Sequence, residues 1–320
     1  MTLRPLKASI IIPARDAIAT VGQAIESVLM DACNEDIELI VVNDGLDEAT
    51  AKLADRYPVK VIPGDGSGPA SARNIGVQAS QGEILIFLDA DCRVSKDWLS
   101  LHLEMHERYN GLLSVGGSIC LEPNASFWAR CDHYCSWYNV HPHQREAWVP
   151  NHPSANLSVS RSTFERIGPF KEDLPKDGVH EEIEWQGRLL FLGGRIRFEP
   201  RAAVWHRDRG AFKSYLKHNY GWGYNSIEIK SRAAVSRFSF LYQKPWALIC
   251  GFIPFAVAHT FYTIVCWLKA GKLEPLFLSP VLFLGRIAYA IGMTIGGIRV
   301  LQNRKTRYPF TGNNCFEFMI

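Results

Sequence analysis

The sequence predicts an α/β fold with a doubly wound, mostly parallel sheet, followed by hydrophobic helices near the C-terminal end. Two observations lead to this prediction. Over the first ninety residues, short apolar runs alternate with segments of helical periodicity. Further along, residues 246–268 contain no Asp, Glu, Lys or Arg, and residues 276–298 contain only Arg286. The 320 residues allow one large domain with an appended segment.

The N-terminal elements follow one another as strand and helix. The β-branched run "SIIIP" (9–13) predicts a strand that ends at a proline, and residues 20–30 place apolar side chains on one helical face. The run "IELIVVND" (37–44) is apolar without alternation, which is typical of a strand covered on both faces. The further expected elements are a helix over 48–57, a strand over 59–63, a loop over 64–69, a helix over 70–80 and a strand over 83–89.

Polar or small residues follow each of these apolar strands. In a doubly wound sheet, ligands bind outside the carboxyl ends of the strands. Asp44-Gly45 is also a favourable turn pair, and Asp16 would serve as a helix cap. Because all the groups fall at one edge, a shared site is the better explanation. The strand-end segments are residues 13–16, 43–45, 64–68 and 89–91.

The stretch "ILIFLDADCRV" (84–94) places Asp89 and Asp91 directly after a buried strand. Residues i and i+2 of an extended backbone project to the same side, so the two carboxylates are expected to converge. They would repel each other unless a cation lay between them. Carboxylates suit Mg²⁺ or Mn²⁺, and a diphosphate would supply further oxygen ligands. An Asp-x-Asp pair often marks only a turn, but its position after a buried strand favours a metal site.

Charge and cysteine content exclude some classes of function. The formal net charge is only +3, which does not indicate nucleic-acid binding. Eight cysteines without a disulfide pattern predict free, mostly buried thiols. Cys131 and Cys135 enclose His133, but no second ligand pair has a zinc spacing, so a structural role is favoured. No signal-peptide pattern opens the chain, which predicts that the N-terminal domain stays in the cytosol.

The two uncharged runs predict a hydrophobic hairpin. Each would form a helix of about 35 Å, which is enough to cross the core of a bilayer. The alternative is a pair of buried core helices, which the prolines, His259 and Arg286 within the runs would suit. The basic residues of the link between the runs are only Lys269 and Lys272, so the positive-inside rule places both flanks in the cytosol. The basic residues of the flanks are Arg232, Arg237, Lys244, Arg299, Arg304, Lys305 and Arg307.

Four segments in a fixed order carry a resemblance to a known family. They are "SIIIPARDA", "ELIVVNDG", "GPASARNIGVQASQGEILIFLDADC" and "HEEIEWQGRLLFLGGRIRFEPRAAVWH". Together they resemble the family 2 inverting glycosyltransferases of the GT-A fold, over about residues 8–225. The resemblance implies transfer of a sugar from a nucleotide-diphosphate sugar of UDP or GDP type. It also implies inversion at the anomeric carbon, with Mg²⁺ or Mn²⁺ as cofactor.

With this resemblance, the expected organisation has four parts. They are a GT-A domain over 1–225, a juxtamembrane linker over 226–245, two transmembrane helices (246–268 and 276–298) within 246–300, and a basic cytosolic tail over 301–320. The enzyme is then expected at the plasma (inner) membrane, with its catalytic domain on the cytosolic face.

The residues on the nucleobase side are implied by the positions that match the family. Pro13, Ala14 and Arg15 would border the base, and a guanidinium is able to stack on a planar ring. Asp44 matches an acidic residue that accepts a hydrogen bond from a ring N–H of the base.

The residues on the diphosphate side are implied in the same way. Arg73 and Asn74 match the start of a donor-binding helix, where Arg73 would pair with phosphate oxygens rather than form a surface salt bridge. Asp89 matches a ribose or metal contact, with Ala90 beside it, and Asp91 matches the metal ligand proper.

The histidine that ends "VWH", His206, matches a family residue close to the metal or the diphosphate, although a lone histidine after a strand is as often structural. The catalytic base is implied at the start of the helix expected over 178–194. The family has Glu-Asp there and this chain has Glu-Glu, so Glu182 takes the base role, with Glu181 or Glu184 as alternatives. Acids at a helix N-terminus are also stabilised by the helix dipole without any catalytic duty.

The acceptor side carries weaker signals. Asn156 lies in "ANLSVSRSTFERIGPF" (155–170), which resembles the strand and turn that shape the acceptor pocket, and a turn-side hydrogen bond is equally compatible. Trp137 and Trp185 are aromatic candidates for stacking on a sugar; core packing or a membrane interface would explain aromatic residues as well. The Gln-x-x-Arg-Trp motif of processive synthases has no match after the base, which predicts addition of a single sugar to a lipid-linked or membrane-associated glycan.

Two other functions stay open at this point. A sugar-phosphate nucleotidyltransferase would share the nucleotide-binding architecture, but "PARDAIATVG" (13–22) stands where its glycine-rich loop is expected. A non-catalytic membrane scaffold with a degenerate transferase domain is supported only by the Glu-Glu pair.

Overall fold

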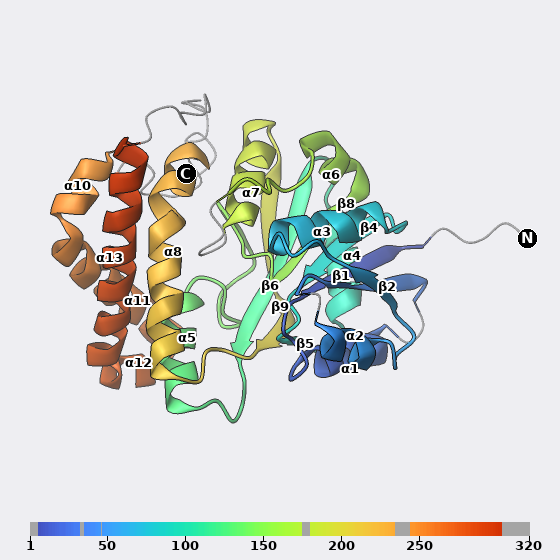
Figure 1. The fold of residues 1–320 in the computed structure, drawn as a ribbon, viewed down its shortest axis with the longest axis horizontal. Coiled ribbons are helices and arrows are strands. Elements are labelled where there is room, and N and C mark those ends of the chain that lie inside the picture. Colours follow the sequence, from blue (N-terminus) through green and yellow to red (C-terminus); the bar gives the residue numbers. More distant parts are fainter. Residues whose placement is uncertain (1–5, 33–34, 46, 175–179, 234–243, 303–320) are drawn as a thin grey trace, which may run out of the picture. The chain divides into compact units, whose positions relative to one another are not determined.

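The computed structural model describes residues 6–32, 35–45, 47–174, 180–233 and 244–302 (Figure 1). The chain divides into two compact units. The sheet unit comprises Met1–Cys120, Arg145–Asp173 and Leu192–His206, and the helical unit comprises Leu121–Gln144, Leu174–Phe191 and Arg207–Ile320. Outside the described residues lie four basic residues of the expected flanks, Arg237, Arg304, Lys305 and Arg307, and the side chain of Arg232.

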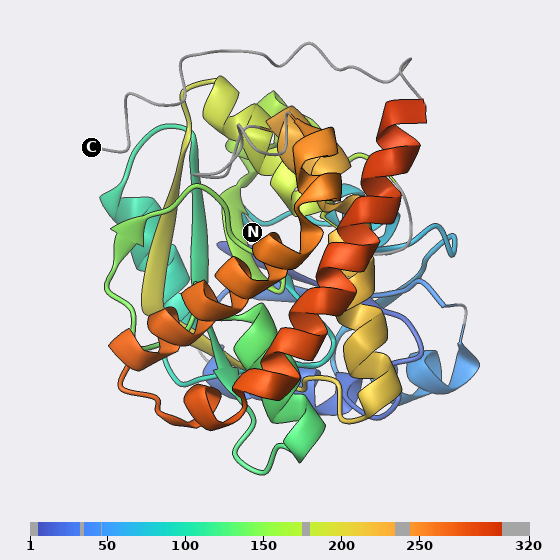
Figure 2. The same cartoon turned by 90° about the vertical axis from the view of Figure 1, so that its left-hand side faces the viewer.

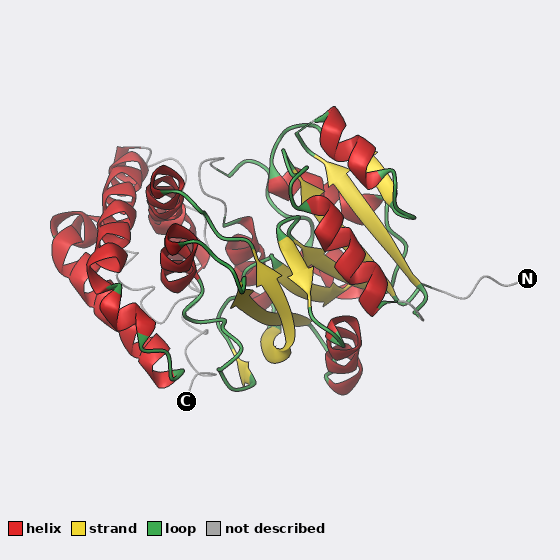
Figure 3. Ribbon diagram, turned by 90° about the horizontal axis from the view of Figure 1, so that it is seen from below, coloured by secondary structure: helices red, strands yellow, loops and turns green. Residues whose placement is uncertain are grey.

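The sheet unit is built around one mixed sheet. Its strands, in the part of the chain that the structure describes, are β1 (Ala8–Ala14), β2 (Ile37–Asn43), β3 (Lys60–Pro63), β4 (Ile84–Leu88), β5 (Cys92–Val94), β6 (Leu113–Leu121), β7 (Ala147–Trp148), β8 (Asn156–Ser160) and β9 (Arg195–His206). Their order is β3-β2-β1-β4-β8-β6-β9-β5, and β7 pairs with β9. Figure 3 shows the strands of this sheet in yellow, with helices beside them. The pairs of β1 with β2 and β4, and of β2 with β3, are parallel. The pairs of β8 with β4 and β6, and of β9 with β5 and β7, are antiparallel.

The helices of the sheet unit are α1 (Val21–Asp31), α2 (Glu48–Ala54), α3 (Pro69–Gln78), α4 (Trp98–Arg108) and α6 (Arg161–Ile167). α3 packs on β1 and β2, and α4 packs on β8 and β9. Gly76 permits the close approach of α3, since a Cβ there would lie 2.4 Å from Cγ2 of Ile11. The predicted α/β fold is confirmed, and so is each element predicted in the first ninety residues. The helix expected over 48–57 ends earlier, at Ala54, because Pro58 disfavours a helical conformation at the residue before it.

A buried polar cluster lies where β8 meets α4. The side-chain oxygen of Asn156 accepts hydrogen bonds from Trp98 Nε1 (2.8 Å) and His102 Nε2 (3.0 Å). Ser158 Oγ lies 2.8 Å from His102 Nδ1 and 2.9 Å from His106 Nε2. Burial lowers the pKa of His102 to about 4 and the pKa of His106 to about 3. Both imidazoles are therefore neutral in the folded state at pH 7.

The helical unit contains α5 (Phe127–Ser136), α7 (Glu181–Phe191), α8 (Phe212–Ala233), α10 (Pro245–Cys250), α11 (Phe252–Lys269), α12 (Glu274–Phe277) and α13 (Ser279–Gln302). Figure 2 shows α11 crossing α13, and α8 running beside α13. Within the described residues, α11 and α13 have the length and composition that a membrane-crossing helix needs. The first hydrophobic run, expected as one helix over 246–268, is divided by Gly251 into α10 and α11.

We expect the folded state to lose stability as the pH falls from 6.5 towards 4. The unfolded chain protonates its histidines near pH 6.5, whereas the folded chain keeps His102 and His106 neutral, so added protons favour the unfolded state. Each of the two should lower the free energy of unfolding by about 1 kcal/mol between pH 7.5 and pH 5.5, as measured by urea denaturation.

Two variants serve as controls for this pH dependence. His106→Gln keeps a hydrogen-bonding group without a titration, so it should weaken the dependence, whereas His143→Gln at an exposed position should leave it unchanged. Equal free energies of unfolding at the two pH values would contradict neutral burial of these imidazoles.

Candidate functional site

The first part of the candidate site lies at the carboxyl ends of β1 and β2. Asp44 follows β2, and only 2% of its surface is exposed. Its N–H donates to the carbonyl oxygen of Ala14 (2.8 Å), and its Oδ2 accepts from the N–H of Gly68 (3.1 Å). Its Oδ1 is buried and accepts no hydrogen bond from the described residues. A buried carboxylate oxygen without a donor is unfavourable, so this atom is available to an N–H group of a ligand.

The loop after β3 is shaped by its contact with Asp44. A Cβ at Gly64 would lie 2.7 Å from the Cα of Asp44 and 3.0 Å from its Oδ1, so only glycine fits without moving the aspartate. Gly66 and Gly68 have φ angles of 72° and 110°, a region that also favours glycine. The loop expected over 64–69 therefore packs its backbone closely against the Asp44 carboxylate.

The end of β1 contributes the residues expected to border a base. Ala14 is buried, and its carbonyl oxygen is the acceptor for Asp44. Pro13 is partly exposed, while Arg15 is exposed and packs beside Gly45. The structure thus brings Ala14, Arg15 and Asp44 together and leaves the guanidinium of Arg15 accessible to a planar ring.

Two residues of α3 hold neighbouring segments. Arg73 is buried, and its Nη2 donates to Asp89 Oδ1 at 2.7 Å, so the pair is not a surface salt bridge. Asn74 donates to the carbonyl oxygen of Phe170 (2.8 Å) and to Glu172 Oε1 (2.7 Å), and it accepts from the N–H of Phe170 (3.0 Å). Arg73 therefore orients Asp89, whereas Asn74 ties α3 to the segment after α6.

The two aspartates after β4 have different partners. The N–H of Cys92 donates to the carbonyl oxygen of Asp89 (3.0 Å), so residues 89–92 form a turn that also buries Ala90. The two carboxylates were expected to converge on the assumption that the backbone is extended. Because these residues form a turn, that argument no longer applies to them. Asp89 pairs with Arg73, and Asp91 Oδ1 lies 3.5 Å from His206 Nε2.

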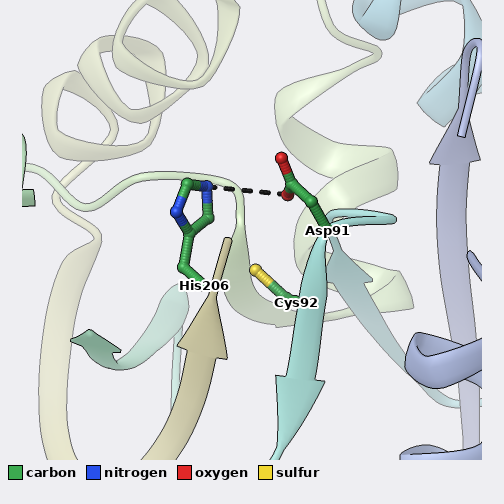
Figure 4. A group of neighbouring side chains, drawn as sticks. All are labelled: Asp91, Cys92 and His206. Carbon is green, nitrogen blue, oxygen red and sulfur yellow. Dashed lines mark ion pairs between the residues drawn. The ribbon is translucent and has the colours of Figure 1, made fainter. Parts of the chain in front are cut away.

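Asp91, Cys92 and His206 form the candidate metal site (Figure 4). β5 pairs with β9 in a register that sets Cys92 opposite His206. One ligand atom of each residue lies within 4.8 Å of the others, and no other group of three such residues does so in the described part of the chain. The carboxylate of Asp91 is partly exposed, while the other two side chains are buried.

The donor set fits a divalent cation. A carboxylate oxygen and an imidazole nitrogen suit Mn²⁺, and the exposed side of Asp91 leaves room for oxygen ligands from water or a diphosphate. The thiol of Cys92 is a softer ligand than the ions expected here prefer. Asp91 and His206 are therefore the residues best placed to hold the ion, and Asp89 is paired with Arg73.

The acidic residues of α7 belong to the helical unit and are buried. Glu184 pairs with Arg188 one turn later, with Oε2 3.0 Å from Nη2. Glu182 Oε1 lies 4.0 Å from His180 Nδ1, and Glu181 is the most buried of the three acids. The guanidinium of Arg188 occupies the lone pairs of the Glu184 carboxylate. Glu182 or Glu181 is therefore favoured as the base that accepts a proton.

The three residues considered for an acceptor are all buried. Asn156 uses its whole amide inside the sheet unit, because it also donates to the carbonyl oxygens of Ser118 (3.1 Å) and Ala202 (2.8 Å). Trp137 and Trp185 are packed inside the helical unit with little exposed surface. Their burial is compatible with packing roles, and each side chain has little surface exposed.

Cys92 was expected only as one of the free, mostly buried thiols, and the structure places its thiol beside Asp91 and His206. The only signal for this group is the register of β5 with β9, which joins residues far apart in the chain. Gly64 was likewise treated as part of a flexible loop, although its contact with Asp44 makes it a site residue. Both contacts depend on strands that are far apart in the chain, so the local spacing of residues predicts neither of them.

The Cys131-x3-Cys135 segment has no metal-binding arrangement among the described residues. His133, which the two cysteines enclose, has its Nδ1 2.9 Å from Asp208 Oδ2. Burial raises the pKa of the Cys131 thiol to about 12, so the thiolate that a metal needs is disfavoured. Both cysteines belong to an apolar cluster of the helical unit.

The parallel strands β1 to β4, joined by α1, α2 and α3 and extended by antiparallel strands, form the GT-A fold of nucleotide-sugar transferases. The sequence model of Glycosyl transferase family 2 matches residues 9–170, about half of the chain, and the chain belongs to this family. It is therefore a glycosyltransferase, an enzyme that transfers a sugar from a nucleotide-sugar donor. The predicted family is confirmed.

Two curated relatives show how far the similarity extends. Glycosyltransferase AglE of Haloferax volcanii is 25% identical over 254 residues, which cover 77% of this chain and 81% of that protein. Probable glycosyltransferase YdaM of Bacillus subtilis is 23% identical over 240 residues, which cover 68% of this chain and 54% of that protein.

Two solved structures share the fold. The mannosyltransferase PcManGT from Pyrobaculum calidifontis, in complex with GDP-Man and Mn²⁺, has a TM-score of 0.58 at 17% identity and covers 91% of this chain and 88% of its own. GalNAc-T7 with UDP, GalNAc and Mn²⁺ has a TM-score of 0.53 at 18% identity and covers 75% of this chain. The chain spans about half the length of YdaM and of GalNAc-T7.

Gly64→Ala should weaken nucleotide binding at least about tenfold, or about 1.4 kcal/mol. The added Cβ would lie 2.7 Å from the Cα of Asp44 and displace the carboxylate that is open to a ligand. Titration calorimetry with UDP and with GDP, each in the presence of Mn²⁺, measures the affinity. Gly210→Ala is the matched control, because its nearest contact would be an ordinary 3.4 Å. Equal affinities for Gly64→Ala and the unaltered chain would show that Asp44 does not contact the nucleotide.

Proposed function

We propose that the chain is a metal-dependent, inverting glycosyltransferase that adds a single sugar to a lipid-linked or other membrane-associated glycan. The observation that carries the proposal is the placement of Asp91, the second aspartate of the Asp-x-Asp pair, 3.5 Å from His206 at the ends of two paired strands. Family membership supplies the class of reaction, and this pair supplies a place for a divalent ion.

The donor is a nucleotide-diphosphate sugar of UDP or GDP type. Asp44 Oδ1 accepts a ring N–H of the base, which supplies the hydrogen bond that this buried oxygen lacks in the described residues. Arg15 lies on the exposed side and stacks on the base, with Pro13 and Ala14 beneath it. The names of two structural neighbours, one with GDP-Man and one with UDP, support these two donor types.

Asp91 and His206 hold a Mg²⁺ or Mn²⁺ ion in this proposal. When bound, the ion neutralises the charge that develops on the departing nucleoside diphosphate. Arg73 keeps the carboxylate of Asp89 in a fixed orientation, 2.7 Å away, where it contacts the ribose or the ion. Both structural neighbours named above contain Mn²⁺, which supports a divalent cofactor.

The transfer is a single in-line displacement. A bond forms between the acceptor oxygen and the anomeric carbon while the bond from that carbon to the diphosphate oxygen breaks, so the configuration inverts. Glu182 takes the proton of the acceptor hydroxyl as the new bond forms. Glu182 is preferred over Glu184, whose carboxylate is paired with Arg188. Glu181 remains the alternative base.

The acceptor is proposed to lie at a membrane because of the C-terminal helices. α11 and α13 are apolar enough to contact lipid over their length. An enzyme held at the inner face of the plasma membrane, with its catalytic domain in the cytosol, meets lipid-linked glycans there. Addition of one sugar, without polymerisation, fits the absence of the Gln-x-x-Arg-Trp sequence.

The direct test uses the purified full chain with a panel of UDP- and GDP-sugars and Mn²⁺ or Mg²⁺. Thermal shift identifies the nucleotide, since a ligand that binds only the folded state raises the melting temperature. Release of UDP or GDP in the presence of membrane lipid extracts then measures transfer. No binding and no turnover with any of these donors would refute the proposed donor and metal assignments.

Asp91→Ala should abolish the metal dependence of donor binding. The change removes the more exposed of the two proposed ligands, so Mn²⁺ should no longer increase the affinity for the nucleotide. Calorimetry with and without Mn²⁺ gives the comparison. Asp55→Ala, at an exposed position at the end of α2, is the matched control and should keep the effect of Mn²⁺. An unchanged effect in Asp91→Ala would place the ion elsewhere.

Glu182→Gln should preserve nucleotide affinity and lower kcat by at least about a hundredfold, because the amide cannot accept the proton of the acceptor. Glu184→Gln removes a partner of Arg188 and should lower thermal stability more than it lowers kcat. Full activity of Glu182→Gln together with inactivity of Glu181→Gln would assign the base to Glu181.

A further inference from the structure

α11 and α13 each expose one apolar face. On α11 it consists of Ile253, Val257 and Phe261, and on α13 of Ile291, Ile295 and Ile298, all between 42% and 69% exposed. The spacings of three and four residues place each set on one side of its helix. These six residues are called the apolar face below. Isolated exposed hydrophobic residues are ordinary, but two contacting helices that each expose several apolar side chains at helical spacing indicate a binding surface.

Other residues of the same helices are covered by protein, and they include polar side chains. Thr263 on α11 and Arg286 on α13 are buried, and Arg286 Nη2 donates to Thr263 Oγ1 at 2.8 Å. The same guanidinium also donates to the carbonyl oxygen of Cys135 on α5. The hairpin therefore has one side that needs an apolar partner and one side that is committed to the helical unit.

α13 lies directly against α8 along most of its length. A Cβ at Gly292 would lie 2.1 Å from the carbonyl oxygen of Tyr220, and a Cβ at Gly296 would lie 1.8 Å from that of Tyr224, so the two backbones touch. Near its end, Arg299 forms an ion pair with Glu228 of α8. Because the two backbones touch, α8 would lie at the same depth in a membrane as α13.

α8 is too polar to cross a bilayer. Its uncharged stretch between Lys217 and Glu228 has ten residues (218–227), or about 15 Å, against a hydrocarbon core of about 30 Å. Inside this stretch, His218 Nδ1 lies 2.8 Å from Asp132 Oδ1, a charged partner from α5. Moving α8 into hydrocarbon would bury these charges at high cost. α13 therefore does not cross the bilayer while it is packed on α8.

The exposed charges on the C-terminal helices and the link between them are all positive within the described residues. In the described residues 244–302, the exposed charged side chains are Lys244, Lys269 and Lys272. Glu274 is partly buried and paired with Arg130. Exposed apolar side chains together with exposed cations on the same segment suit the boundary between acyl chains and anionic headgroups. A second copy of the chain would bring the same cations to both sides of an interface with no exposed acid there to balance them.

We infer that the apolar face docks on the surface of a bilayer that contains anionic lipid, with α11 and α13 lying in one leaflet instead of crossing the membrane. The inference deepens the membrane attachment proposed above and rests on it. It replaces the two expected spans, 246–268 and 276–298, by an in-plane hairpin. The link at residues 270–273 then lies on the same side of the membrane as Lys244.

Labelling of single cysteines distinguishes the two arrangements. Lys272→Cys and Lys244→Cys are introduced into a chain with Cys250→Ser and Cys266→Ser, and the same chain without an added cysteine sets the background. Sealed inside-out vesicles from expressing cells are treated with a membrane-impermeant maleimide before and after detergent. We expect both added cysteines to be labelled before detergent to the same extent. Protection of Lys272→Cys until detergent is added, with Lys244→Cys labelled throughout, would establish a crossing hairpin and overturn the inference.

Flotation of the purified full chain with vesicles tests the surface itself. The double variant Phe261→Gln, Ile295→Gln should reduce the vesicle-bound fraction several-fold, and the unaltered chain should bind vesicles with anionic phosphatidylglycerol better than neutral phosphatidylcholine vesicles. Met30→Gln, at a 79% exposed position in the sheet unit, is the matched control and should bind normally. Unchanged binding of the double variant, or a dimer that the double variant disrupts without any vesicle binding, would overturn the inference.

These measurements do not depend on turnover. Loss of sugar transfer in a chain that still floats with vesicles and is labelled on one side would count against the proposed reaction alone. Protection of Lys272→Cys from the maleimide in a fully active enzyme would count against the in-plane hairpin alone.

Discussion

The side-chain amide of Asn156 fixes the geometry on which the sheet unit depends. It accepts two hydrogen bonds from side chains of α4, and it donates to Ser118 on β6 and Ala202 on β9. One buried group on β8 thus holds three neighbouring elements, and an unsatisfied partner at any of them would cost about 1–3 kcal/mol. Because β9 carries His206 at its end, the candidate metal site depends on this amide through the strand pairing.

Local patterns in the sequence were sufficient to predict the strands of the parallel half of the sheet. Buried parallel strands are continuous apolar runs, and β1, β2 and β4 carry that pattern without ambiguity. The sequence left the turn at residues 89–92 undecided, because Asp-Ala-Asp-Cys is compatible with a turn and with the end of an extended strand. The expected convergence of Asp89 and Asp91 assumed an extended backbone, and the partners that the structure gives them, Arg73 and His206, come from distant segments.

The hydrophobic helices show a second limit of local patterns. Composition finds an uncharged run of sufficient length, but it does not show which side of the helix is covered by protein. The segment "NYGWGYN" (219–225) matches no motif used above, and in the structure it lies in the part of α8 that contacts α13. A Cβ at Gly223 would lie 1.9 Å from the carbonyl oxygen of Tyr289, so a polar helix occupies the position that lipid would otherwise take.

The open oxygen of Asp44 has a consequence for the nucleotides that the enzyme turns away. In its proposed role, Oδ1 accepts a hydrogen bond from a ring N–H on the Watson–Crick edge of the base. Uracil and guanine carry a ring N–H on that edge, whereas cytosine and adenine present a bare ring nitrogen. Two lone pairs facing each other in a buried place would repel and leave both atoms unsatisfied. One carboxylate therefore separates the four common bases into two classes by a single hydrogen, irrespective of whether the base is a purine or a pyrimidine.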